Sequence, residues 1–183
     1  MSLVPKKVFF TKGVGYHKRK LASFEEALRD AGIERFNLVQ VSSIFPPYCI
    51  EINKEDGLSQ LRSGQIVYTV LARESSNEYG RVITASIGVA KPGSKETYGY
   101  LSEHHTFGVK PEHAADEAED LAAEMLASTL GISGFDPEAN YNEKRQVYEL
   151  SDKIVETKSI IAHTNVREEN EWATVLAAAV FIL

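Results

Sequence analysis

Residues 37–47 read Asn-Leu-Val-Gln-Val-Ser-Ser-Ile-Phe-Pro-Pro, a strand-like run that stops at two serines. The apolar and β-branched residues from Asn37 to Val41 predict a β-strand. Ser42 and Ser43 stand at its end. The pair Pro46-Pro47 has no backbone N–H to donate and forces an extended or turning backbone. The stretch therefore predicts a strand that ends at a serine pair and cannot continue in its sheet.

On the N-terminal side of this stretch the sequence predicts one strand and one helix. Lys7 to Phe10 is the predicted strand, and the polar, glycine-bearing residues 11–20 are a predicted loop. Ser23-Phe-Glu-Glu26 has the spacing of a capping box, in which the two polar side chains satisfy free amides at a helix start. The predicted helix ends at Gly32, where a left-handed backbone costs least. Its inward face consists of Phe24, Ala27, Leu28 and Ala31.

On the C-terminal side, more strands and a second helix are predicted. Val, Ile, Thr and Tyr enrichment marks strands at 65–72, 81–90 and 97–105, one or two within 148–166, and a last one at 172–183. Pro111 stands in the first turn of a long helix that ends near Leu130, and Gly131 closes it. Its apolar stripe consists of Ala114, Ala118, Leu121, Ala122, Met125 and Leu126. Many strands with two segregated helices predict an α+β sandwich with mostly antiparallel sheets.

Composition narrows the class of protein. A chain of 183 residues is the size of one domain (1–183), and 43% hydrophobic with 25% charged residues is typical of a globular protein. Cys49 is the sole cysteine, so an intrachain disulfide is impossible and a cytoplasmic location is expected. Cys49 itself is expected to be a small buried hydrophobe. The N-terminus lacks the apolar run of a signal peptide.

Charge and length argue against two classes of partner. The net charge of −6 does not suit a nucleic-acid-binding protein, whose affinity comes from basic patches. The apolar end, residues 172–183, is shorter than the ~20 residues that cross a bilayer. We therefore expect neither a nucleic acid nor a membrane as partner.

Several familiar motifs almost match and fail. Residues 88–95 resemble a phosphate loop, but the lysine comes one place late and a strand follows. Gly13-Val-Gly15 lacks the third glycine of a dinucleotide loop. His104 and His105 are adjacent, so on a strand they point to opposite faces and cannot share a metal, and His113 is not at metal spacing. No metal is therefore expected.

The serine pair admits two interpretations. In one, Ser42 and Ser43 satisfy stray backbone groups before a proline turn. In the other, the Ser43 hydroxyl attacks the Ser42 carbonyl in a strained turn and converts the peptide into an ester. β-Elimination then breaks the ester at residue 43, and the oxygen leaves with the Ser42 acyl group. The dehydroalanine that remains is hydrolysed to a terminal ketone, with release of ammonia. A donor must hold the developing oxyanion, and the Asn37 side chain is a candidate.

The chain resembles the pyruvoyl-dependent arginine decarboxylases over most of its length. The resemblance is strongest at residues 24–33, Phe-Glu-Glu-Ala-Leu-Arg-Asp-Ala-Gly-Ile, in the serine-pair stretch 37–47, and at residues 99–103, Gly-Tyr-Leu-Ser-Glu. The Ala-rich end, residues 174–181, is also similar. The pattern Asn-Leu-x-x-x-Ser-Ser-Ile-x-Pro-Pro is far more specific than a lone serine pair, and it favours the self-cleaving interpretation.

The resemblance implies a four-layer αββα sandwich whose chain is made as a zymogen. Autocatalytic cleavage would fall between Ser42 and Ser43, giving a small chain 1–42 and a large chain 43–183 that remain in one fold. The cofactor would be a covalent pyruvoyl group derived from Ser43. Family members assemble as trimers or as dimers of trimers, with active sites at subunit interfaces.

The resemblance also implies roles for individual residues. Asn37 occupies the position of the processing asparagine, and Glu103 that of the proton donor in decarboxylation. Glu25 stands where the family has an aspartate that contacts the substrate guanidinium, so this chain carries a longer side chain there. The pyruvoyl ketone would form a Schiff base with the α-amine of L-arginine, releasing carbon dioxide and agmatine, which feeds polyamine biosynthesis. Glu103 must then be protonated near neutral pH, so burial should raise its pKa.

Two other functions remain open from the sequence. The same chemistry would serve another amino acid, such as histidine, because the charge of the pocket cannot be read from the chain. An unprocessed, non-catalytic trimeric binding protein with the same fold is the second alternative. Both are separable by experiment, the first by carbon dioxide release across amino acids and the second by the mass of the active protein.

Overall fold

The computed structural model describes residues 3–132, 136, 141–142, 147–148 and 153–183, which contain two large β-sheets, a two-stranded sheet, two long helices and a short one. The first sheet contains, in spatial order, β2 (Asn37–Gln40), β5 (Ile66–Ser76), β11 (Trp172–Ile182), β1 (Lys7–His17) and β4 (Ile50–Glu51). The second contains β10 (Ile154–Asn165), β6 (Val82–Pro92), β7 (Gly99–Phe107) and β3 (Ile44–Phe45). The helices are α1 (Lys20–Ala31), the short α2 (Lys54–Ser59) and α3 (Pro111–Thr129), and β8 (Tyr141–Asn142) pairs with β9 (Val147–Tyr148).

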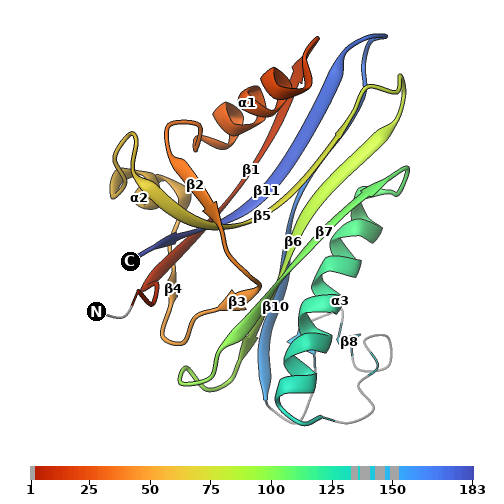
Figure 1. The fold of residues 1–183 in the computed structure, drawn as a ribbon. Helices are drawn as coiled ribbons and strands as arrows, with labels where there is room; N and C mark the ends of the chain where they lie inside the picture. The colour runs from red at the N-terminus through yellow and green to blue at the C-terminus, as the bar shows by residue number, and fades with distance from the viewer. Residues whose placement is uncertain (1–2, 133–135, 137–140, 143–146, 149–152) are drawn as a thin grey trace.

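These elements form four layers. The sheets pack face to face, α1 covers the outer face of the first, and α3 covers the outer face of the second (Figure 1). The pairings β2–β5 and β1–β4 are parallel, whereas the other pairings between described strands are antiparallel. The predicted αββα sandwich with mostly antiparallel sheets is therefore confirmed.

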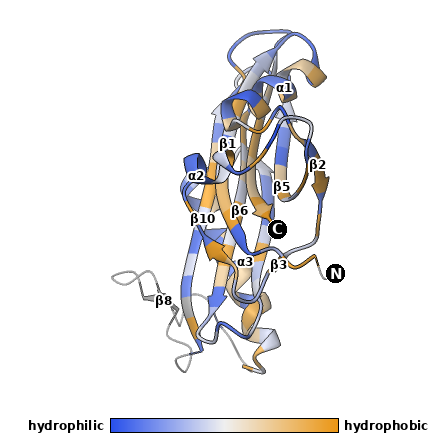
Figure 2. Cartoon of the chain, turned by 90° about the vertical axis from the view of Figure 1, so that its left-hand side faces the viewer, coloured by the Kyte–Doolittle hydropathy of each residue, from blue (hydrophilic) through white to orange (hydrophobic). Residues whose placement is uncertain are grey.

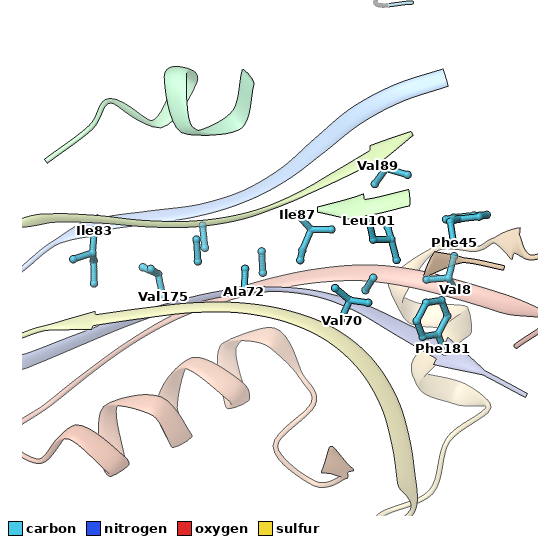
Figure 3. Close-up of a cluster of buried hydrophobic side chains, with 14 of the residues drawn as sticks. Val8, Phe45, Val70, Ala72, Ile83, Ile87, Val89, Leu101, Val175 and Phe181 are labelled. Atoms are coloured by element: carbon cyan, nitrogen blue, oxygen red, sulfur yellow. The ribbon is translucent and has the colours of Figure 1, made fainter. Parts of the chain in front are cut away.

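The main hydrophobic core lies between the two sheets. Its members come from both inner faces, as Figure 3 shows: Val8, Val70, Ala72, Val175 and Phe181 from the first sheet, and Phe45, Ile83, Ile87, Val89 and Leu101 from the second. β11 is buried on both faces, since its odd-numbered residues face the second sheet while Leu176, Ala178 and Val180 face α1. This double burial explains why the C-terminal run is apolar throughout rather than alternating. Figure 2 shows hydrophobic residues on the strands between the helices and also on β2 and β3.

The first strand is longer than the sequence predicts, and the predicted loop at residues 11–20 is wrong. β1 continues to His17 and pairs with β11 along its whole length. The helix begins at Lys20, three residues before the predicted cap Ser23. Ser23 is therefore no cap: its hydroxyl donates to the Lys20 carbonyl at 2.8 Å and contacts the Thr174 hydroxyl at 2.7 Å. The helix ends at Gly32 (φ 76°), as predicted.

Two glycines explain why this segment looked like a loop. A Cβ at Gly13 would lie 2.0 Å from the Ala27 carbonyl oxygen, and one at Gly15 would lie 2.2 Å from that of Ser23. The glycines thus let the backbone of α1 approach β1 directly. They serve helix–sheet packing, and not a turn or a nucleotide loop.

Replacing Gly13 by alanine is expected to destabilise the protein by about 3 kcal/mol, because the added methyl group collides with helix backbone that cannot yield without opening the core. Urea unfolding followed by circular dichroism measures the change. Gly64→Ala is the matched control, since Gly64 has φ 82° and open space around it. In Gly64→Ala the added methyl group meets no neighbour, so the only expected loss of stability is about 1 kcal/mol for alanine in a left-handed backbone conformation. A midpoint for Gly13→Ala at or above that of Gly64→Ala would contradict the packing role.

The later elements differ from prediction mainly at their ends. The strands predicted at 65–72, 81–90 and 97–105 extend further, to Ser76, Pro92 and Phe107. The stripe predicted on α3 is partly wrong, because Leu121 is 40% exposed while Ala123 and Ala127 are fully buried. The strand predicted within 148–166 is β10, and residues 149–152 of that range lie outside the described part of the chain.

None of the helices in the described ranges is both long and apolar enough to cross a membrane.

Candidate active site

The serine pair lies where the chain crosses from one sheet to the other. β2 runs beside β5 as far as Gln40, and the Val41 N–H then donates to the Thr69 carbonyl at 3.0 Å. β3 begins at Ile44 and pairs with β7 in the second sheet. Residues 41–43, named the crossover below, therefore join the edges of the two sheets (Figure 1).

Backbone donors hold the carbonyls on both sides of the Ser42–Ser43 peptide bond. The Ile44 N–H donates to the Ser42 carbonyl oxygen at 2.9 Å and closes a three-residue turn centred on Ser43. The Leu101 N–H of β7 donates to the Ser43 carbonyl oxygen at 2.8 Å. The turn is of the common inverse γ type, since Ser43 is not among the positive-φ residues. The Ser42 carbonyl is thus polarised by a backbone donor two residues further along the chain.

Glu103 lies on β7, two residues beyond Leu101, which corresponds to about 7 Å along the strand. Its carboxyl group faces the first sheet and interacts with the Leu71 N–H of β5, whereas Ser102 points the other way and donates to the Ala118 carbonyl of α3. Partial burial raises the pKa of Glu103 above its ordinary value, although the Leu71 N–H and His105 act in the opposite direction. The register of β3 against β7 thus brings Ser43 and Glu103 into the same region.

The structure places Asn37 away from the serine pair. Asn37 is the first residue of β2, and its side-chain amide donates to the Gly64 carbonyl at 2.7 Å. The four residue steps from Asn37 to Val41 span about 13 Å of extended chain. Within one chain the Ile44 N–H, and not the Asn37 amide, is the donor to the Ser42 carbonyl. A role for Asn37 in processing stays a prediction.

Glu25 belongs to another layer of the protein. It lies on α1, outside the first sheet, and forms an ion pair with Arg29 one turn along at 2.9 Å. The side chain of Arg29 is 58% exposed and that of Glu25 is 44% exposed. One chain therefore does not bring Glu25 to Ser43, and substrate contact by Glu25 stays a prediction.

A hollow of about 420 Å³ adjoins the crossover. Its lining is almost wholly apolar and consists of Leu3, Val4, Pro5, Val41, Ser42, Ile44, Pro46, Pro47, Tyr68 and Phe181. The size and lining suit the hydrocarbon part of a small ligand. Because the lining includes no acidic residue, a partner for a cationic group has to come from outside this hollow.

The chain after the serine pair is anchored independently of the chain before it. Ile44 and Phe45 pair with β7, and the Ile50 N–H donates to the Lys6 carbonyl at 2.9 Å. Glu51 then bridges the sheets through Lys158 and through Lys91, which lies 2.9 Å away. Burial alone would raise the pKa of Glu51, but its hydrogen bonds to the two lysines hold that pKa below its ordinary value.

The two adjacent histidines and the cysteine lie in contacts that stabilise the fold. The Nε2 atom of His104 lies 2.9 Å from the Glu117 carboxylate on α3, and that of His105 lies 4.0 Å from Glu74 on β5, so the two imidazoles face opposite layers as predicted. Burial raises the pKa of Cys49 to about 11, and the residue is half-buried against the core. In the part of the chain that is described, no three His, Cys, Asp or Glu side chains come together as a metal site does.

Sequence reasoning missed the groups that surround the serine pair. The donors are the backbone amides of Ile44 and Leu101, which no residue type reveals. Gln40 was also missed: its side-chain amide donates to the Leu71 carbonyl at 3.2 Å, next to the Leu71 N–H that faces Glu103. A glutamine in a predicted strand carries no signal of such a contact, because the contact depends on which strand lies beside it.

Comparison with known proteins shows the family to which the chain belongs. The sequence model of the family described as pyruvoyl-dependent arginine decarboxylase matches residues 7–183. A probable pyruvoyl-dependent arginine decarboxylase of Chlorobaculum parvum is 54% identical over 182 residues, which cover 100% of this chain and 99% of the relative. Proteins named pyruvoyl-dependent arginine decarboxylase from Thermoplasma volcanium (51% identical, 98% and 97% covered) and Nitrosopumilus maritimus (48%, 100% and 100%) are also similar.

The fold and the crossover define a sandwich whose serine pair bridges two sheets. The chain belongs to the pyruvoyl-dependent arginine decarboxylase family.

Proposed function

We propose that this protein decarboxylates L-arginine to agmatine and carbon dioxide with a pyruvoyl group that it makes from Ser43. The observation that carries the proposal is the Ile44 N–H at 2.9 Å from the Ser42 carbonyl oxygen, in a chain of this family. That oxygen is the atom on which negative charge develops when the Ser43 hydroxyl attacks. A donor at this distance stabilises such a charge.

Self-cleavage follows from the groups at the crossover. The Ser43 oxygen adds to the Ser42 carbonyl carbon, and the bond from that carbon to the Ser43 nitrogen breaks, leaving an ester and a free amine. Loss of the Ser43 α-proton then expels the Ser42 carboxylate and leaves a dehydroalanine. Water converts the dehydroalanine into a ketone and releases ammonia. The balance is one uncut chain plus one water, giving chains 1–42 and 43–183 and one ammonia.

The two pieces are expected to stay together after cleavage. The small chain contributes β1, which lies inside the first sheet between β11 and β4, and α1, which covers that sheet. β1 pairs with β11 from Lys7 to His17. Extracting β1 would expose core residues such as Val8 and Phe9, both fully buried. Such burial favours a stable, non-covalent pair of chains.

The surroundings of residue 43 fit a pyruvoyl group. Residue 43 is half-buried, its carbonyl oxygen accepts from the Leu101 N–H, and the chain after it is anchored by β3 and Glu51. The group would supply a ketone that attaches the substrate amine and withdraws electrons as carbon dioxide leaves. The Leu101 N–H would polarise the neighbouring carbonyl, and protonated Glu103 would deliver a proton to the α-carbon of the substrate.

Recognition of the guanidinium group is expected to involve more than one copy of the chain. The hollow beside Ser42 suits the methylene groups of arginine but has no carboxylate in its lining. Glu25, the proposed guanidinium contact, lies on α1 of the same chain and away from the crossover. We therefore propose a homotrimer, alone or as a dimer of trimers, in which Glu25 and Asn37 reach the crossover of a neighbouring chain.

Release of carbon dioxide from labelled amino acids tests the choice of substrate. The purified, processed protein is expected to release it from L-arginine, and from lysine or histidine at least about 100-fold more slowly, because neither offers the planar two-donor edge of a guanidinium. Faster release from histidine would replace arginine as the substrate. A processed protein inactive on every amino acid, or an active but uncut one, would overturn the proposed function.

A further inference from the structure

The edge of β5 is left uncovered where β2 departs. β2 pairs with β5 as far as Gln40 opposite Thr69, and the Val41 N–H to Thr69 carbonyl bond is the last backbone contact between them in the described chain. In a strand, alternate residues direct both N–H and C=O to the same side. Leu71, two residues after Thr69, therefore presents its N–H and C=O to the place that β2 has vacated.

Two side chains occupy that place. The Gln40 amide nitrogen donates to the Leu71 carbonyl at 3.2 Å. The Glu103 carboxyl group, which arrives from β7 in the other sheet, interacts with the Leu71 N–H. Leu71 of β5 thus contacts both Gln40 from the first sheet and Glu103 from the second sheet.

The same two side chains lie on either side of the serine pair. Gln40 precedes Ser43 by three residues along the crossover. Glu103 follows Leu101, whose N–H holds the Ser43 carbonyl at 2.8 Å. Fixing Gln40 and Glu103 to Leu71 therefore fixes the proposed proton donor relative to the residue from which the cofactor is made.

Cleavage would increase the importance of Gln40. Before cleavage the crossover is continuous and its geometry is constrained from both ends. After cleavage Ser42 becomes a free chain terminus, and termini fray unless they are tied down. Val41 is still held by its N–H bond to Thr69 and by packing against the core, and the Gln40 amide is the last side-chain hydrogen bond of the small chain among the described residues.

From this arrangement we propose that Gln40 is a positioning residue for decarboxylation: through Leu71 it holds the end of the small chain and aligns the Glu103 carboxyl group with residue 43. The inference rests on the proposed function. Gln40 does not touch the reacting atoms, so its effect is expected on turnover and not on cleavage. Misplacement of a catalytic group by about 1 Å can lower a rate about 100-fold.

Gln40→Met tests the inference, because methionine keeps the length and volume of glutamine but cannot donate a hydrogen bond. The variant is expected to be cleaved completely and to show a kcat reduced about 10- to 100-fold with KM little changed. Gln60→Met is the matched control. Gln60 also donates a side-chain amide bond to a backbone carbonyl, that of Asp56 at 2.8 Å, but it lies on the far side of the first sheet next to α2. Its kcat is expected to equal that of the wild type.

The pH profile separates alignment from a general loss of structure. Losing the Gln40 tie loosens the Leu71 N–H from the Glu103 carboxyl group, so the alkaline limb of kcat is expected to move to higher pH. His105 on β7 and Glu74 on β5, the titratable neighbours on the two strands, are unchanged in the variant. Gln40→Glu, which has the same length, is expected to move the limb further in the same direction by placing a second carboxylate beside the first.

The outcomes are distinguishable. A fully processed Gln40→Met with wild-type kcat and pH profile overturns the inference while leaving the proposed function intact. A Gln40→Met that remains uncut also overturns it, since Gln40 would then act on cleavage. A wild-type protein that is inactive or uncut overturns the proposed function itself.

Discussion

Ser43→Ala is expected to remain one uncut chain of 183 residues and to lose decarboxylation completely. The substitution removes the oxygen that attacks the Ser42 carbonyl, so neither the ester nor the ketone can form. Wild-type protein is expected to give two chains whose summed mass equals that of the uncut chain plus one water and minus one ammonia. Intact-mass spectrometry measures both results, and no other substitution in this chain is expected to have a larger effect.

Ser42→Ala is the matched control for this experiment. Ser42 contributes its carbonyl to the reaction, and alanine has the same carbonyl in the same turn. The variant is therefore expected to be cleaved and to be active. Cleavage of Ser43→Ala, or equal loss of cleavage in both variants, would show that the Ser43 hydroxyl is not the attacking group.

Glu103→Gln is expected to be cleaved normally and to lose about 10²- to 10⁴-fold in kcat, the usual contribution of a positioned acid. Glutamine preserves the shape of the side chain but cannot deliver a proton. Burial raises the pKa of Glu103, so the wild-type side chain keeps its proton to higher pH than an ordinary glutamate. Wild-type kcat is accordingly expected to fall as pH rises through that raised pKa, and the residual activity of the variant is expected to lack this decrease.

Glu117→Gln serves as the control, because Glu117 lies on α3, which covers the other face of β7. Glu117 contacts His104, which points toward α3, away from the crossover. This variant is expected to retain wild-type kcat and the alkaline decrease. Glu103→Gln with unchanged turnover would remove Glu103 from its proposed role, whereas an uncut Glu103→Gln would assign it to processing instead.

Much of the architecture was predictable because it depends on local patterns. The apolar run of residues 172–182 and the proline-started helix at 111–129 are long enough for pattern and propensity to agree. Errors arose where tertiary packing reversed a local signal. Gly13 and Gly15 are read as loop residues, yet in the folded chain they give the backbone of α1 room against β1. The Ser23 signal for a helix start fails for the same reason, since its hydroxyl is used inside the packed interface.

For the candidate site, too, some features were predictable from the sequence and others were visible only in the structure. The sequence by itself determined the family and pointed to the serine pair and Glu103 as candidate site residues, because these depend on the identity and order of side chains. Only the tertiary structure decided which groups surround the pair: the amides of Ile44 and Leu101, and the Leu71 edge that Gln40 and Glu103 share. It also separated Asn37 and Glu25 from the crossover of their own chain. The physical reason is that backbone donors look the same in every residue, and strand register alone determines where they point.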